Sequence, residues 1–280
     1  MNSEHPLIKI DLDAVLESRL GRWHSLIPSF LRKKLKRYIC QDELNALLES
    51  NYPRRGAAFC KGVFSDLNIK LSATGTQNLP SPTDTRTIIV SNHPLGGLDG
   101  MALISFFTDY YGRDVLFVVN DLLMAIDPLR NVFLPVNKHG SQSRADMRAL
   151  DSAMASDTPV IIFPAGLVSR RQPDGSIRDL TWQKMFVNKA IAHQRTIIPV
   201  HFGGHNSDGF YKLAARRARL GLKFNIEMLR LPSEVFKLRD ATLHLSIGKP
   251  IPTQKLRSLS PAAMAAEIKD IVYSLSPNHT

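Results

Sequence analysis

The 280-residue sequence has few cysteines, no long apolar run and no internal repeat. Its two cysteines, Cys40 and Cys60, are too few for a disulfide framework and lack the spacing of metal ligands, so we expect a reducing, cytoplasmic environment. No segment approaches the roughly 20 apolar residues that span a bilayer, and the opening residues, MNSEHP, lack the basic-then-apolar order of a signal peptide. Any contact with a membrane is therefore expected at its surface.

Acidic charge is also scarce, because 36 Lys and Arg residues against 25 Asp and Glu residues leave a net charge of +11. Such a charge favours polyanionic partners, namely nucleic acid, anionic lipid or an acidic carrier protein. No recognisable nucleic-acid-binding motif accompanies the charge. We therefore expect no nucleic-acid partner.

Two segments concentrate the positive charge. Residues 29–40 carry five basic residues and no acidic one, and Phe30, Leu31 and Leu35 fall on one helical face. This pattern predicts a basic amphipathic helix that either binds an anionic membrane surface or packs its apolar face on the domain. The second segment either touches anionic lipid or a carrier protein or is a solvated helix face. It contains Lys212, Arg216, Arg217, Arg219 and Lys223.

The apolar patterns predict an α/β fold, with a mixed central sheet covered by helices, over residues 71–280. Residues 1–70 are predicted to form a helical N-terminal region. The expected strands are 87–91, 115–119, 132–136, 160–163, 196–201 and 242–247. The expected helices are 11–19, 29–39, 41–49, 56–64, 143–156, 182–193 and 261–274.

Residues 91–100, SNHPLGGLDG, place an imidazole and a carboxylate on a tight loop between a strand and an apolar helix. An unperturbed imidazole, with a pKa of about 6.5, can accept a proton at neutral pH, and a carboxylate on its other nitrogen would fix the tautomer. His93 and Asp99 are therefore a candidate general base and its orienting partner. The alternative is that Asp99 only caps the helix and His93 is an ordinary surface residue.

A second buried strand ends in a Pro/Gly turn followed by two arginines, in the segment IIFPAGLVSRR at 161–171. Because ligands bind at strand ends in α/β sheets, this turn is expected near His93. Arg170 and Arg171 could bind a phosphate or carboxylate, or they could form a solvated basic turn. His201 and His205 lack a third ligand with suitable spacing, so we expect no metal.

The two motifs together resemble those of the glycerolipid acyltransferase superfamily, which includes bacterial lysophosphatidate acyltransferases. IIPV at 197–200 is similar to the last motif of that superfamily, and the likeness covers most of residues 70–250 in the family's order. Two departures stand out: five residues instead of four separate His93 from Asp99, and Ala165 replaces the usual glutamate. The wording of both motifs is closer to a branch labelled "hemolysin", related to O-acyltransferases of ornithine and glycine lipids.

The resemblance implies O-acyl transfer from an acyl carrier protein or coenzyme A thioester to a lyso-lipid, with no cofactor beyond that co-substrate. His93 would be the general base, oriented by Asp99, and a backbone amide near Gly96, Gly97 or Gly166 would stabilise the oxyanion. The enzyme would work as a peripheral protein at the inner face of the cytoplasmic membrane. The expected substrate-binding residues are Asn92, Gly96, Gly97, Asn137, Lys138, Phe163, Pro164, Gly166, Ser169, Arg170 and Arg171.

Because Ala165 removes a carboxylate, we expect an acceptor that contains an amino acid. The close alternative is a 1-acylglycerol-3-phosphate acyltransferase that makes phosphatidic acid. Two other classes stay open: a hydrolase that uses His93 to activate water, and a membrane-active, hemolysin-like binding protein without catalysis.

Overall fold

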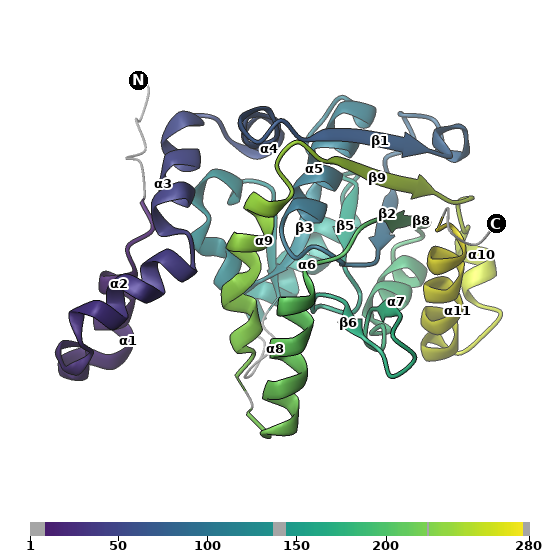
Figure 1. Ribbon diagram of the computed structural model, residues 1–280. Coiled ribbons are helices and arrows are strands. Elements are labelled where there is room, and N and C mark those ends of the chain that lie inside the picture. Colours follow the sequence, from purple (N-terminus) through teal and green to yellow (C-terminus); the bar gives the residue numbers. More distant parts are fainter. Residues whose placement is uncertain (1–8, 137–143, 223, 277–280) are drawn as a thin grey trace.

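The computed structural model describes residues 9–136, 144–222 and 224–276, and its centre is a seven-stranded sheet in the order β1-β9-β8-β2-β5-β3-β4 (Figure 1). Only the β8–β9 pair is antiparallel, so β1 and β9 run opposite to the other five strands. The predicted mixed sheet is thereby confirmed. The strands are β1 Lys70–Thr74, β2 Thr87–Ser91, β3 Leu116–Asn120, β4 Phe133–Val136, β5 Val160–Ile162, β8 Thr196–Phe202 and β9 Thr242–Ile247.

Helices cover both faces of the sheet (Figure 1). A two-stranded hairpin of β6 Arg170–Arg171 and β7 Ile177–Arg178 lies outside the sheet. The helices of the chain's first half are α1 Leu12–Leu20, α2 Ser29–Tyr38, α3 Gln41–Ser50, α4 Gly56–Asp66 and α5 Leu98–Tyr111. Those of its second half are α6 Arg144–Ala155, α7 Met185–Ala192, α8 Asp208–Arg219, α9 Leu231–Lys237, α10 Thr253–Leu256 and α11 Pro261–Ser274, with a 3-10 helix, η5, at Ile226–Arg230.

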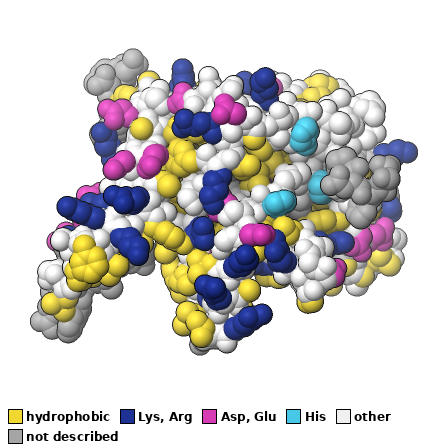
Figure 2. Space-filling model, in the orientation of Figure 1, with side chains coloured by type: hydrophobic (Ala, Val, Ile, Leu, Met, Phe, Trp, Pro, Cys, Tyr) yellow, Lys and Arg dark blue, Asp and Glu magenta, His cyan; other side chains and the backbone are white. Residues whose placement is uncertain are grey.

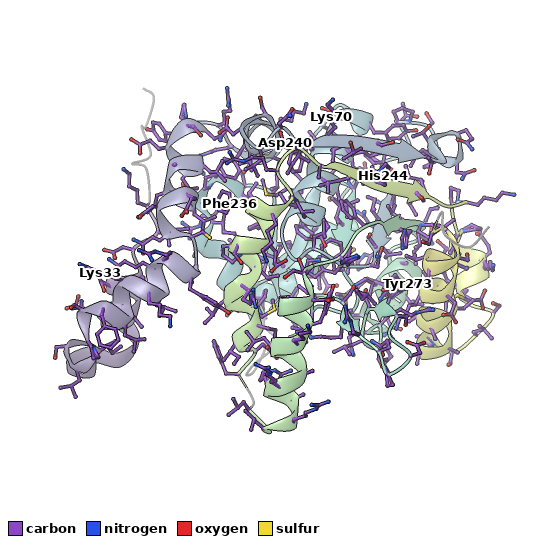
Figure 3. All side chains as sticks on the ribbon, in the orientation of Figure 1. Lys33, Lys70, Phe236, Asp240, His244 and Tyr273 are labelled. Carbon is purple, nitrogen blue, oxygen red and sulfur yellow. The ribbon has the colours of Figure 1, made fainter. Side chains whose placement is uncertain are left out.

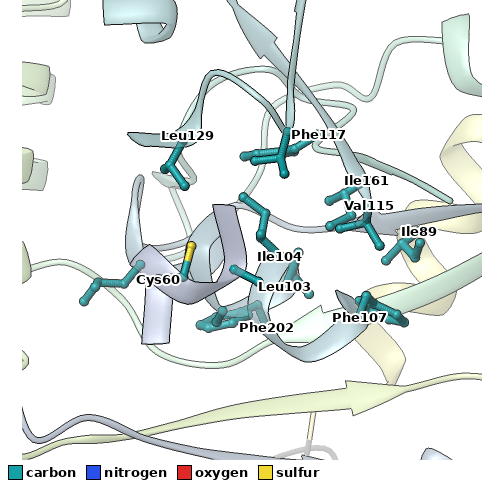
Figure 4. Close-up of a cluster of buried hydrophobic side chains, with 14 of the residues drawn as sticks. Cys60, Ile89, Leu103, Ile104, Phe107, Val115, Phe117, Leu129, Ile161 and Phe202 are labelled. Carbon is teal, nitrogen blue, oxygen red and sulfur yellow. The ribbon is translucent and has the colours of Figure 1, made fainter. Parts of the chain in front are cut away.

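Two separate hydrophobic cores lie on the two faces of the sheet, as the alternation of side chains along a strand requires. In β2, Ile89 belongs to the core shared with α4 and α5, whereas Ile88 and Val90 belong to the core shared with α6, α7 and α11. Figure 4 shows the first core, in which Cys60 of α4 lies fully buried among aliphatic and aromatic side chains. Both faces of β2 are therefore buried. This packing holds the strand in place up to its last residue, Ser91, where the His93 loop begins.

The predicted element boundaries agree closely where the apolar pattern is strong. The strands at 87–91 and 242–247 and the helix at 261–274 have the predicted limits. Helix α7 begins three residues after the expected Trp182, because the indole of Trp182 donates a hydrogen bond to Asp179 and belongs to the preceding loop. The sequence prediction missed β1, a short strand with only two apolar side chains whose place depends on its pairing with β9.

The N-terminal helices differ in how they pack. Helix α4 is part of the first core, whereas α1 and α2 project from the body at the lower left of Figure 1. No residue of α2 is buried, and Phe30 and Leu31 are 71% and 46% exposed, whereas Leu35 is half-buried, so the first turn of its apolar face does not pack into the domain. In the described residues no helix combines the length and the apolar character needed to cross a bilayer. A division of the chain at residue 70 stays a prediction.

Candidate active site

The carboxyl end of β2 brings the two sequence motifs together. Strand β2 is parallel to both of its neighbours, β5 and β8, so the loops that leave these three strands emerge at the same edge of the sheet. His93 lies on the first loop and Phe163 on the second. Their rings stack with centroids 4.1 Å apart and an interplanar angle of 21°. The expected closeness of the two motifs is confirmed.

His93 and Asp99 are hydrogen-bonded in spite of the extra residue between them. Nδ1 of His93 lies 2.9 Å from Oδ2 of Asp99, and the same oxygen accepts the backbone N–H groups of Leu95 and Gly96 at 2.9 and 3.2 Å. The predicted contact is thus confirmed. The side chain of Asp99 is fully buried, whereas that of His93 is 15% exposed. The imidazole therefore stands between a buried carboxylate and the surface.

Gly96 makes the tight loop possible. Its φ of +83° lies in the left-handed region, which glycine enters without a steric penalty. A Cβ at this position would also lie 2.7 Å from a methyl carbon of Leu231 and 2.9 Å from one of Val168. Both the backbone conformation and the available space thus require glycine, and this turn accommodates the fifth intervening residue.

The pKa of Asp99 is held below its usual value. Burial alone would raise this pKa, but the neighbouring His93 and the hydrogen bonds from the ring and the Leu95 and Gly96 amides outweigh burial. Asp99 is therefore an ionised hydrogen-bond acceptor at neutral pH. A carboxylate in this state keeps the proton of the neutral imidazole on Nδ1 and directs the lone pair of Nε2 away from itself.

A second buried carboxylate, Asp179, supports the backbone of the His93 loop. Its Oδ1 accepts the backbone N–H of His93 at 3.2 Å and the hydroxyl of Ser169 at 2.6 Å, and its Oδ2 accepts the indole N–H of Trp182 at 2.9 Å. The N–H of Asp179 donates in turn to the hydroxyl of Tyr273, labelled on α11 in Figure 3. Sequence reasoning missed Asp179, because this residue lies 86 positions from His93 and belongs to no motif.

Several residues expected to bind substrate hold the loops together. The side-chain amide of Asn92 both donates to and accepts from the backbone of Phe202, which ties the His93 loop to β8. The N–H of Ser169 donates to the carbonyl of His93 at 2.8 Å. The carbonyl of Pro164 accepts the N–H of Gln183. These hydrogen bonds give the polar residues after the strands a structural role, which is to hold the loops together. The expected roles of Asn92, Pro164 and Ser169 in substrate binding stay predictions.

Both arginines of the second motif are already paired with carboxylates. Nη2 of Arg170 lies 2.9 Å from Oε1 of the fully buried Glu227, and its guanidinium lies over the ring of Phe210. Arg171 makes an exposed ion pair with Asp208 at 2.5 Å. Their expected role in binding an anionic acceptor stays a prediction, as does that of Asn137 and Lys138, which lie outside the described residues.

The backbone N–H groups of the three candidate glycines differ in whether they already donate a hydrogen bond within the protein. The Gly96 N–H donates to Asp99, and the Gly166 N–H donates to the carbonyl of Phe163. Gly97 precedes the first turn of α5, and within the described residues its N–H donates to no backbone carbonyl outside the helices and strands. The same part of the chain holds no group of three or more His, Cys, Asp and Glu side chains that could bind a metal.

Comparisons with known proteins extend over almost the whole chain. A model of an acyltransferase family matches residues 15–272. Lyso-glycine lipid O-acyltransferases of Phocaeicola vulgatus and Bacteroides thetaiotaomicron are each 42% identical over 274 residues, which cover 98% of this chain and 97% and 100% of those proteins. The crystal structure of the 1-acyl-sn-glycerophosphate acyltransferase PlsC from Thermotoga maritima aligns with a TM-score of 0.48 and 18% identity, over 95% of this chain and 93% of that chain.

The family model and the two relatives agree with the resemblance that the motifs around His93 and Phe163 indicate. The match to the family model and the alignments with the two relatives all include the strands, loops and helices that build the candidate site. The chain is therefore an enzyme of the acyltransferase family and belongs to the glycerolipid acyltransferase superfamily.

Proposed function

We propose that this enzyme transfers a fatty acyl group from an acyl carrier protein or coenzyme A thioester to the hydroxyl of a lysolipid that contains an amino acid. The observation that carries the proposal is the contact of 2.9 Å between Nδ1 of the part-exposed His93 and the buried carboxylate of Asp99. This contact prepares Nε2 to take a proton from an incoming hydroxyl.

The reaction balances without a cofactor. The acceptor oxygen attacks the thioester carbonyl carbon while Nε2 of His93 takes the hydroxyl proton, and Asp99 stabilises the imidazolium that forms. The tetrahedral intermediate then collapses, the C–S bond breaks, and the thiolate leaves with the proton returned by His93. The products are the O-acylated lipid and the free thiol of the carrier.

Gly97 is the proposed source of the oxyanion-stabilising amide. The amides of Gly96 and Gly166 are used inside the protein, whereas the Gly97 N–H stands beside the N-terminus of α5, where the helix dipole favours negative charge. A correctly aimed donor of this kind is worth about 3 kcal/mol of transition-state stabilisation.

The acceptor class rests on two observations. The curated relatives are lyso-glycine lipid O-acyltransferases, and the buried Ala165 leaves an apolar methyl where the superfamily usually has glutamate. The close alternative, lysophosphatidate as acceptor, differs in carrying a phosphate. The net charge of +11 suits either polyanionic donor and an anionic membrane surface.

Helix α2 is the proposed contact with that surface. Its apolar side chains Phe30 and Leu31 are 71% and 46% exposed beside a run of Lys and Arg residues. We propose that the enzyme binds peripherally at the inner face of the cytoplasmic membrane through this helix. Vesicle flotation tests it: K33E/K34E should bind anionic vesicles more weakly than wild type at low salt, and equal binding would refute the role of α2.

The deciding experiment incubates purified protein with radiolabelled acyl carrier protein and coenzyme A thioesters and a panel of acceptors. The panel contains lyso-glycine lipid, lyso-ornithine lipid, lysophosphatidic acid and a reaction without acceptor, with H93A as the control. Acyl transfer to an amino-acid lysolipid that H93A lacks is the expected result. Transfer to lysophosphatidic acid alone would select the alternative acceptor. Release of free fatty acid without an acceptor would indicate a hydrolase, and no turnover with any donor would leave a binding protein.

A further inference from the structure

The turn between α8 and η5 ends in exposed apolar side chains. Leu220 is 73% exposed, Phe224 is 68% exposed and Leu222 is 46% exposed. In Figure 1 this helical hairpin projects from the lower side of the body, and Figure 2 shows yellow hydrophobic atoms at its end. Within residues 9–136, 144–222 and 224–276, neither the sheet nor another helix buries these three side chains, although each is large enough to favour burial.

The turn itself is ordered by backbone hydrogen bonds. Gly221 has a φ of +66°, its N–H donates to the carbonyl of Ala218, and the N–H of Leu222 donates to the carbonyl of Arg217. These two bonds form a Schellman motif, in which the residue after the glycine usually packs back on the helix. Here the backbone of Leu222 bonds to Arg217, but its side chain stays 46% exposed. The fold thus directs the apolar side chains outward from a defined turn.

Buried ion pairs hold the hairpin on the catalytic body. Glu227 of η5 is fully buried between Arg170 and Arg217, at 2.9 and 3.1 Å. Nη1 of Arg217 also donates to the carbonyl of Leu222, so one guanidinium joins the turn to the buried carboxylate. Arg170 follows Ser169, whose N–H donates to the carbonyl of His93. The exposed turn is therefore connected to the His93 loop through four contacts: Arg217 with Leu222, Arg217 with Glu227, Glu227 with Arg170, and Ser169 with His93.

Positive charge lies along one side of the helix that leads to the apolar turn. Lys212, Arg216 and Arg219 are exposed on α8 at positions i, i+4 and i+7, which places them on one side of the helix. In Figure 1 the hairpin and the α1–α2 pair both extend toward the lower edge of the molecule, and Figure 2 shows Lys and Arg side chains with hydrophobic ones on both projections. Apolar side chains next to basic ones complement the acyl chains and the anionic headgroups of a bilayer.

We propose that the α8–η5 turn inserts Leu220, Leu222 and Phe224 into the interface of an anionic bilayer as a second anchor beside α2. A bilayer fits better than a protein partner, because three side chains on a convex turn cover far less than the roughly 1,000 Å² of a specific protein interface. Two anchors would fix how the body is oriented on the membrane. This inference rests on the proposed lipid acceptor, since a lysolipid resides in the membrane.

The test measures binding of the full-length protein to vesicles of phosphatidylglycerol and phosphatidylcholine by flotation. L220S/F224S is compared with M147S/L259S, whose two exposed side chains lie on α6 and before α11. We expect at least a tenfold lower partition coefficient for L220S/F224S and no change for M147S/L259S, because burying one leucine or phenylalanine is worth about tenfold or more. R216Q/R219Q should bind more weakly than wild type at low salt and equally at high salt, where salt screens the charges. L220S/F224S should bind more weakly than wild type at both salt concentrations.

Activity distinguishes the anchor from a damaged site. L220S/F224S should acylate detergent-dispersed acceptor at the wild-type rate and vesicle-embedded acceptor at least tenfold more slowly. If the protein transfers no acyl group at all, flotation still decides the inference and only the proposed function fails. Wild-type flotation of L220S/F224S would overturn the inference. It would also be overturned if the substitutions converted a dimer to a monomer in light scattering without changing vesicle binding.

Discussion

The two loops beside His93 use buried carboxylates in opposite ways. In the loop after β2, Asp99 contacts the imidazole ring, and its pKa is lowered. In the segment after β5, Asp179 contacts the backbone of His93 instead, and burial raises its pKa although the bonds from Ser169 and Trp182 oppose the shift. Burial beside the proposed general base therefore does not define the role of a carboxylate, because the group that the carboxylate contacts decides that role.

The largest expected effect follows from removing the reactive side chain of the first loop. H93A should lower acyl transfer about 100- to 10,000-fold while the protein still folds, because the substitution removes the general base and the buried Asp99 keeps its hydrogen bonds from the Leu95 and Gly96 amides. D99N should also lower acyl transfer severely, because a neutral amide oxygen accepts the N–H groups of His93, Leu95 and Gly96 less strongly than a carboxylate does. Turnover and thermal melting are measured together. A folded H93A enzyme with near-wild-type turnover would end the mechanism.

The next effect separates the two arginines of the second loop. R170A should lower the free energy of unfolding by about 3 kcal/mol, because it leaves the buried Glu227 with only Arg217 as a charged partner. R171A, which breaks an exposed pair with Asp208, should cost less than about 1 kcal/mol. Urea unfolding checks the difference. In kinetics, a raised acceptor KM with unchanged kcat in either variant would support a role in acceptor binding, and two unchanged KM values would exclude one.

A smaller effect tests Asp179 as a positioning residue. D179N places an amide N–H₂ opposite the Trp182 indole or the Ser169 hydroxyl, both donors, and should cost about 1–3 kcal/mol of stability and lower kcat more than it raises KM. The cost should be smaller in a W182F background, where one competing donor is gone. A double-mutant cycle of D179N and W182F measures this difference in the free energy of unfolding, and H93A is measured beside it as a third variant. Additive effects of D179N and W182F would contradict the shared network.

The smallest effect is a difference in pH dependence. The raised pKa of Asp179 means that its burial as an anion costs stability at neutral pH, and that this cost disappears as pH falls through the raised pKa. The deficit of D179N relative to wild type should therefore grow as pH falls from neutral through the raised pKa toward the unfolded pKa of about 4, by about 1.4 kcal/mol per unit of pKa shift. Asp99, with a lowered pKa, stabilises the fold above its unfolded pKa of about 4 and loses this below it. The D99N deficit should stay constant to pH 5 and shrink only in stronger acid.

Much of the site could be predicted from sequence because its elements are local. An apolar β-branched strand, a His-Pro-x-Gly-Gly turn and an acid in the first helical turn lie within ten residues, so the glycine at position 96 and the contact from His93 to Asp99 follow from short-range geometry. The alternation of strands and helices predicted a mixed sheet covered by helices, whereas the parallel pairing of β2 with β5 came from the structure.

Asp179, Glu227 and the exposure of Leu220, Leu222 and Phe224 could not be found in this way. Asp179 belongs to the loop before Trp182, and Glu227 lies 57 residues beyond Arg170, so no spacing connects either residue to its partner. For residues 29–40 the sequence left two alternatives, packing and exposure, because an amphipathic pattern states which residues share a face but not what covers that face.

The sequence by itself determined the fold class, the strand ends that carry His93 and Phe163, and the acyltransferase family. These depend on hydrophobic periodicity and on motifs of adjacent residues, which the chain carries locally. Only the tertiary structure decided that Asp179 holds the backbone of His93, that Glu227 occupies the guanidinium of Arg170, and that Phe30 and Phe224 stay exposed. Each of these depends on which distant segments the sheet brings together, and burial and ion pairing arise only once those segments meet.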